Sequence, residues 1–125
     1  MKYGTQRMVM YPHLNAAGIL FGGMALSWID EDAIIFAANV LDTNRIATVK
    51  MSEVVFKSAA NIGDILISGV ELVRIGRTSI TVKCELRNKT TNHIIVDVEE
   101  VVIVALDYNK KPTLHKLAPK DDTIA

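Results

Sequence analysis

Asp30 is the residue in this chain that most clearly suits a chemical role, because it stands in an otherwise apolar segment. Residues 22–38 are rich in Ile, Ala and other apolar types, and the neighbours of Asp30 on its helical stripe are mostly small. An apolar segment of this kind predicts a mostly buried helix. A buried carboxylate costs several kcal/mol unless it is hydrogen-bonded, paired or neutralised, so the sequence favours a functional role for it.

Two glycines precede Asp30 at the expected start of the helix. The first N–H groups of a helix have no partner within it, and Gly22 and Gly23 lack the Cβ that would block a ligand oxygen. Such donors are typical of an oxyanion hole. Asp30 lies about 10–12 Å from Gly22 along the axis, so a ligand reaches both only if it lies along the helix or the helix start is wound inward.

The periodicity predicts one helix and five strands. The helix runs from about residue 22 to about residue 41 and ends at polar residues. Residues 11–21 contain a proline, an asparagine and a glycine, which favour an irregular loop. Alternating or β-branched segments predict strands at residues 5–10, 46–57, 65–75, 78–87 and 93–106.

The order of strand, long helix and four further strands predicts the α+β class. The apolar helix should pack against one curved antiparallel sheet in two layers, with the sheet wrapped around the helix. No repeat, linker or low-complexity segment divides the sequence. Residues 1–125 are therefore expected to form one domain, with a C-terminal tail over about residues 108–125 whose end is mobile.

Composition argues against several classes of partner. The 14 basic and 14 acidic residues balance without a basic run, which argues against nucleic acid. No apolar run reaches the roughly 18 residues of a membrane span, and the first residues hold no signal core. The single cysteine, Cys84, fits a reducing compartment. We therefore expect a soluble cytoplasmic protein that does not bind membranes.

The apolar content predicts self-association. Hydrophobic residues make up 50% of the chain, and the mean hydropathy is +0.25, which is more apolar surface than one small core readily buries. Trp28 and Ile35 project from the helix away from the Asp30 stripe, so we expect them at a subunit interface.

The motif around the two glycines resembles that of the hotdog-fold acyl-CoA thioesterases. These enzymes carry approximately Asn-x-x-Gly-x-x-[Phe/His]-Gly-Gly and then an Asp on the following helix, and residues 15–23 with Asp30 are similar to it. Residues 48–51, 63–64 and 76–79 extend the likeness, which covers about residues 5–107. It is nearest to bacterial short-to-medium-chain acyl-CoA hydrolases, and it implies a long central helix wrapped by a five-stranded antiparallel sheet.

The resemblance implies a role for each matching residue. Asp30 would be the general base or nucleophile, the Gly22 N–H would polarise the thioester carbonyl, and Asn15 would orient the water or substrate. Thr48 would come from the neighbouring subunit and hold the water, because we expect the strand after the helix to carry it away from Asp30 of its own chain. Residues expected to meet the substrate are Gly23, Lys57, Arg77, Thr78 and Ser79.

The implied reaction is hydrolysis of an acyl-CoA thioester to a carboxylic acid and coenzyme A. A thiolate leaves readily, so one carboxylate and a few donors suffice, with no metal or organic cofactor. The resemblance also implies active sites shared between two subunits, with dimers assembling into tetramers or hexamers. The sequence does not determine the length of the acyl chain, or whether its carrier is coenzyme A or acyl carrier protein. The chain departs from the family at residues 31–33, where relatives often have a glycine, and at Ile19, where many have a polar residue.

Other interpretations stay open at this point. Alternatives on the same fold are a non-catalytic acyl-CoA binding or sensing module, and a hydratase or dehydratase that uses His13. Asp30 also fits a structural role, satisfied by the backbone or by Thr48. Roles outside catalysis are also expected for several residues. Glu31 and Asp32 would be solvated or paired across an interface, and His93 and His115 would lie at the surface. Lys57 and Arg77 would lie on a solvated edge, and Cys84 would be buried and inert.

Overall fold

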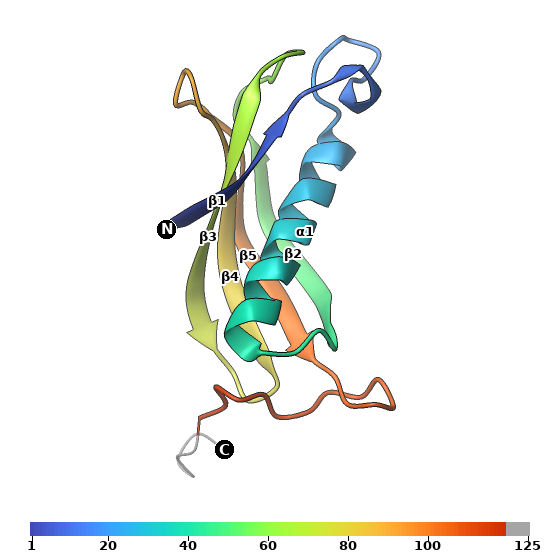
Figure 1. Ribbon diagram of the computed structural model, residues 1–125, viewed down its shortest axis with the longest axis vertical. Helices are drawn as coiled ribbons and strands as arrows, with labels where there is room; N and C mark the ends of the chain where they lie inside the picture. The colour runs from blue at the N-terminus through green and yellow to red at the C-terminus, as the bar shows by residue number, and fades with distance from the viewer. Residues whose placement is uncertain (120–125) are drawn as a thin grey trace.

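A long helix lies against one side of a curved antiparallel sheet (Figure 1). The computed structural model describes residues 1–119. The strands lie in the order β1-β3-β4-β5-β2, and every neighbouring pair is antiparallel. This arrangement confirms the α+β prediction and the wrapped helix. The elements are β1 (Lys2–Met8), the 3₁₀ turn η1 (Tyr11–His13), α1 (Gly22–Leu41), β2 (Ile46–Phe56), β3 (Ile65–Ile75), β4 (Ser79–Asn88) and β5 (Ile94–Ala105).

The observed boundaries of the helix and strands agree with the predicted ones to within one residue, except at β1. This strand begins earlier than predicted because its pairing with β3 extends from Lys2 opposite Val70 to Met8 opposite Ile65. The helix ends at Leu41, where the next residue adopts a left-handed conformation with φ of 53°.

One face of α1 is buried and the other is not. Ile35 is 53% exposed, so the expectation of a mostly buried helix holds for one face only, since one sheet covers one side. Trp28 is 6% exposed within its own chain, which corrects its predicted place at a subunit interface. The buried residues recur at helical spacing: Ala25, Trp28, Ile29, Asp32, Ala33, Ala37 and Leu41.

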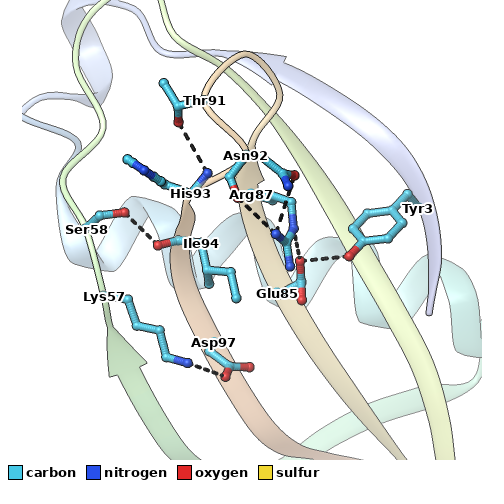
Figure 2. Close-up of polar contacts among 10 residues, drawn as sticks. All are labelled: Tyr3, Lys57, Ser58, Glu85, Arg87, Thr91, Asn92, His93, Ile94 and Asp97. Carbon is cyan, nitrogen blue, oxygen red and sulfur yellow. Dashed lines mark hydrogen bonds and ion pairs between the residues drawn. The ribbon is translucent and has the colours of Figure 1, made fainter.

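The alternating apolar and polar residues of β4 predict that its outer face is exposed to solvent, but this face is partly buried. Glu85 is only 6% exposed, because the Tyr3 hydroxyl and the Arg87 guanidinium donate hydrogen bonds to its carboxylate at 2.9 and 2.7 Å (Figure 2). Gly69 lies between Tyr3 and Glu85 in the cross-strand register. A Cβ at position 69 would lie 2.8 Å from the Tyr3 ring, so the glycine lets this ring cross β3.

Residues 107–119 form turns without a helix or strand, as the lack of periodicity predicts. An isolated bridge between Leu106 and Pro112 folds this segment back on itself. The tail end that was expected to be mobile, residues 120–125, lies outside the described residues. No helix within residues 1–119 combines the length and the apolar character that crossing a membrane requires.

Candidate active site

The start of α1 presents N–H donors that the protein itself does not use. Phe21 is the N-cap residue, and its side chain makes no capping hydrogen bond. Its carbonyl accepts from the N–H groups of Met24 and Ala25, while no hydrogen bond found within residues 1–119 uses the N–H of Gly22 or Gly23. These two donors lie at the positive end of the helix and remain available to a ligand oxygen.

A pocket of about 400 Å³ opens beside Gly22. Asn15 stands in its lining, and its Oδ1 accepts hydrogen bonds from the backbone N–H groups of Ala17 at 2.9 Å and Ile19 at 3.3 Å. The side-chain oxygen thus accepts hydrogen bonds from the loop, which leaves the amide NH₂ as a donor available to a ligand. The lining consists of Asn15, Ile19, Leu20, Gly22, Ala25, Phe56, Lys57, Ser58, Ala59, Ala60 and Ile95.

Phe56 explains why position 22 needs a glycine in this structure. A Cβ at Gly22 would lie 3.3 Å from the Phe56 ring, tighter than ordinary van der Waals contact. The glycine therefore lets the last residue of β2 close over the helix start. The predicted grouping of Asn15 with Gly22 is present in the structure.

Asp30 is half-buried and has a hydrogen-bond partner in its own chain. The Thr48 hydroxyl donates to Asp30 Oδ1 at 2.5 Å. The expectation that Thr48 is carried away from Asp30 of the same chain is therefore wrong. The expectation of a buried Asp30 holds only in part, since this side chain keeps some exposure.

Chain geometry accounts for the Asp30–Thr48 contact. From Asp30 to the helix end at Leu41 the axis advances about 16 Å. The seven residues from 42 to 48 span up to about 25 Å in extended form. Because β2 runs back along α1 (Figure 1), the Thr48 hydroxyl can reach Asp30 near the middle of the helix.

Asp32 is the buried carboxylate of α1. The prediction that Asp32 is solvated or paired across an interface is therefore wrong. Its side chain is 4% exposed. Arg7 of β1 donates to both of its oxygens, at 2.7 and 3.0 Å, and Ser68 of β3 donates to Oδ2. The spacing held the missing signal: Asp32 follows Trp28 by four residues and Ile29 by three, which places it on the core face.

Cys84 of β4 is buried, as expected. Burial, together with the nearby carboxylates of Asp32 and Asp30, raises the pKa of the Cys84 thiol to about 12. The thiol is therefore protonated at neutral pH, which agrees with the inert role expected for it.

Lys57 lies at the rim of the pocket and points toward the outer face of the sheet. Its ammonium is 3.2 Å from the Asp97 carboxylate, and the neighbouring Ser58 hydroxyl donates to the Ile94 carbonyl at 2.6 Å (Figure 2). The Lys57 side chain is 45% exposed, so it remains accessible to a ligand in solvent.

Arg77, Thr78 and Ser79 are not brought to this pocket. Arg77 and Thr78 lie in the β3–β4 turn and Ser79 begins β4, at the end of the sheet where α1 finishes, whereas α1 begins with Gly22 at the opposite end (Figure 1). His115 packs against this turn, with Nε2 2.9 Å from the Ser79 carbonyl oxygen. His115 is 7% exposed, which corrects its predicted surface position, whereas His93 is exposed as expected.

His13 is held by local contacts. Its Nδ1 accepts a hydrogen bond from the Met10 N–H at 3.0 Å, and its ring packs edge-on against Trp28 with centroids 4.8 Å apart. The ring nitrogen nearest the backbone is thus occupied, and nothing in these contacts favours a hydratase or dehydratase role.

Comparison with known proteins gives matches over most of the chain. The family model described as the thioesterase superfamily matches residues 17–95. A Buchnera aphidicola (subsp. Baizongia pistaciae) protein named "uncharacterized acyl-CoA thioester hydrolase" is 32% identical over 85 residues, covering 68% of this chain and 62% of that protein. A Zymomonas mobilis protein of the same description is 27% identical over 122 residues, covering 94% and 79%. The chain spans only 62% of this Buchnera protein, and 56% of a second Buchnera relative that is 30% identical over 77 residues.

Two solved structures are also similar. A hexameric hotdog-fold thioesterase of Campylobacter jejuni has a TM-score of 0.78 and 28% identity, covering 90% of this chain and 88% of that one. An acyl-CoA hydrolase of Staphylococcus aureus, solved with butyryl coenzyme A, coenzyme A and coenzyme A disulfide, has a TM-score of 0.79 and 27% identity. It covers 98% of this chain and 73% of that one. The hotdog fold expected from the sequence is confirmed.

Proposed function

Because this chain belongs to the thioesterase superfamily, we propose that it hydrolyses acyl-CoA thioesters to a free carboxylic acid and coenzyme A. The observation that carries the proposal is the uncapped start of α1, where the Gly22 N–H opens into an apolar pocket beside Asn15. Donors fixed in this way stabilise the oxyanion that forms when water attacks a thioester carbonyl. The two relatives named as acyl-CoA thioester hydrolases support the same reaction.

In the proposed reaction, Asp30 accepts a proton from a water molecule while the water oxygen bonds to the carbonyl carbon. The Gly22 N–H stabilises the resulting oxyanion, and the Asn15 amide NH₂ orients the water or the carbonyl. The C–S bond then breaks and the thiolate leaves, taking up the proton. The Thr48 hydroxyl fixes the Asp30 carboxylate through the 2.5 Å hydrogen bond. These groups supply every step, so the proposal needs no metal or organic cofactor.

One chain alone does not place both groups on one carbonyl. Gly22 and Asp30 are eight residues apart on α1, about 12 Å along the axis. We therefore propose that Asp30 of one copy serves the donor of a second copy, in a dimer that assembles further into a tetramer or hexamer. The exposed side of α1 and the free edge of β2 carry apolar side chains that suit such contacts: Ile35, Val49, Val55 and Phe56.

The assembly predicts a mass that is a multiple of 13.8 kDa in sedimentation at micromolar concentration. Ile35→Glu should reduce this mass, because it places a charge in the apolar contact. The matched control is Val73→Glu, since Val73 has similar exposure, 50%, but lies on β3. A parent of 13.8 kDa with full activity would contradict the proposal.

The same assembly offers a role for the polar residues at the pocket rim and at the far end of the sheet. Lys57 at the pocket rim, and Arg77, Thr78 and Ser79 of another copy, would hold the phosphates of coenzyme A. Gly23 would add a second N–H at the helix start. The free Cys84 thiol is compatible with a reducing, cytoplasmic location, which we include in the proposal.

Replacement of Arg77 by Ala should raise KM for acyl-CoA about 10-fold and change kcat little, because the side chain binds the substrate away from the reacting atoms. Steady-state kinetics with one acyl-CoA measures both constants. Lys89→Ala is the control, since Lys89 is also an exposed cation but lies at the opposite end of the sheet. Equal effects of the two substitutions would show a general charge effect and not a phosphate contact.

The experiment that tests the function is thiol release measured over a series of acyl-CoA substrates, with acyl carrier protein thioesters in parallel. Release of coenzyme A supports the proposal. Tight binding of acyl-CoA without release would indicate a binding module instead. Consumption of an unsaturated or hydroxylated acyl group with the thioester intact would indicate a hydratase or dehydratase.

A further inference from the structure

The pocket beside Gly22 has a buried part lined by apolar side chains. Ala25 and Ala60 are each 1% exposed and Ile95 is 3% exposed, yet all three line the pocket. Phe56, by contrast, is 53% exposed at the rim. We call the part lined by Ala25, Ala60 and Ile95 the floor of the pocket, and the exposed part beside Phe56 its rim.

Two alanines keep the floor open. Ala25 follows Gly22 by three residues on the same side of α1, about 4.5 Å further along the axis. Ala60 is held beside the loop that precedes the helix, because its carbonyl accepts a hydrogen bond from the Leu20 N–H at 2.9 Å. A larger side chain at either position would take up part of the space in this pocket.

The chemistry of the lining favours one arm of a thioester over the other. The floor offers hydrocarbon from Leu20, Ala25, Ala60 and Ile95, and its side chains carry no hydrogen-bonding group. The pantetheine arm of coenzyme A carries amides and ends in phosphates, so burying it there would leave polar groups unpaired. The charged residue of the lining, Lys57, lies at the open rim. The acyl chain therefore points to the floor, and the coenzyme A arm leaves past Lys57.

We propose that Ala25, Ala60 and Ile95 set the longest acyl chain that this protein accepts. The inference rests on the proposed thioesterase activity. A carbonyl oxygen bound at Gly22 directs the first acyl carbons toward Ala25, one helical turn away, so a short chain fills the space and a longer one meets the floor. The three side chains act on chain length and take no part in bond breaking.

The first test is Ala25→Val, compared with Ala38→Val as a matched control. Ala38 is a half-buried alanine on the same helix, 13 residues further along, and does not line this pocket. Each methylene in an apolar pocket changes kcat/KM by about 10–200-fold. We expect Ala25→Val to lower kcat/KM at least about 10-fold for the longest acyl-CoA that the parent hydrolyses, while acetyl-CoA changes by less than about 3-fold.

The second test is Ile95→Val, which removes one methyl group from the floor. We expect the longest accepted acyl chain to grow by about one carbon. Ile103→Val is its control, because Ile103 is a buried isoleucine of the same strand outside the pocket. This gain remains measurable if Ala25→Val does not fold, and circular dichroism identifies that case.

The outcomes separate the two proposals. If the parent hydrolyses no acyl-CoA, the proposed function fails. If the parent is active and both substitutions leave the chain-length profile unchanged, the assignment of the floor is overturned while the function stands. A uniform fall for all chain lengths in Ala25→Val, with no gain in Ile95→Val, would likewise overturn it, because the pocket would then hold the part common to all substrates.

Discussion

Asp30→Asn is expected to lower kcat for acyl-CoA hydrolysis by about 10²–10⁴-fold, the range for loss of a general base. An amide does not take up the water proton at neutral pH. The fold should persist, because the Asn Oδ1 accepts the hydrogen bond that the Thr48 hydroxyl now donates to Asp30 at 2.5 Å. Steady-state thiol release gives kcat, and circular dichroism checks the fold.

Glu31→Gln is the matched control for this experiment. Glu31 is the neighbouring acid, its side chain is 58% exposed, and its carboxylate makes only a 3.6 Å ion pair with Arg7 and a long hydrogen bond with Ser27. Its replacement should change kcat by less than about 2-fold. An Asp30→Asn protein as fast as the parent would remove Asp30 from the mechanism.

Arg7→Met is expected to lower the free energy of unfolding by about 3–5 kcal/mol, the cost of removing one partner of a buried ion pair. Asp32 would keep its charge in a site where its side chain is only 4% exposed, and Ser68 alone would remain as a partner. Thermal unfolding measures the loss, which should exceed about 6 °C in Tm for a chain of this size.

Two further variants test whether the loss comes from the stranded charge. Arg7→Met with Asp32→Asn should recover part of the stability, because the buried charge is removed together with its partner. Arg74→Met removes an arginine from the exposed Arg74–Glu100 pair, 2.9 Å apart with the arginine side chain 61% exposed, and should cost less than about 1 kcal/mol. If Arg7→Met is as mild as Arg74→Met, the Arg7–Asp32 contact contributes nothing specific.

The contrast between Asp30 and Asp32 shows where sequence reasoning is weak. Both acids lie in the same apolar segment, and the pattern of small neighbours drew attention to Asp30. Nothing local shows that Arg7, 25 residues earlier, reaches Asp32, because that contact requires β1 to pair with β3 beside the helix. The helical spacing of Asp32 from Trp28 and Ile29 indicates its burial, but the partner that neutralises it is not placed by the sequence.

The residues that act through backbone geometry are predictable from the sequence. Glycines at a helix start leave N–H groups free wherever the helix is, and Gly22 and the preceding Asn15 do line one pocket, whereas Gly23 does not line it. Arg77–Ser79 were grouped with them through the resemblance, yet they occupy the opposite end of the sheet in one chain (Figure 1). Their role therefore depends on the proposed assembly.

By itself, the sequence determined the class of the fold and nearly all its element boundaries, because hydrophobic periodicity and turn residues are local properties that pairing only reinforces. It also determined the chemistry available at the start of α1. Only the tertiary structure decided that Thr48 contacts Asp30 of its own chain, that Asp32 is buried against Arg7, and that Ala25 and Ala60 line the pocket beside Gly22. Each of these depends on how β1, β2 and the loops pack around one helix, and contacts between residues distant in sequence leave no periodic signal to read.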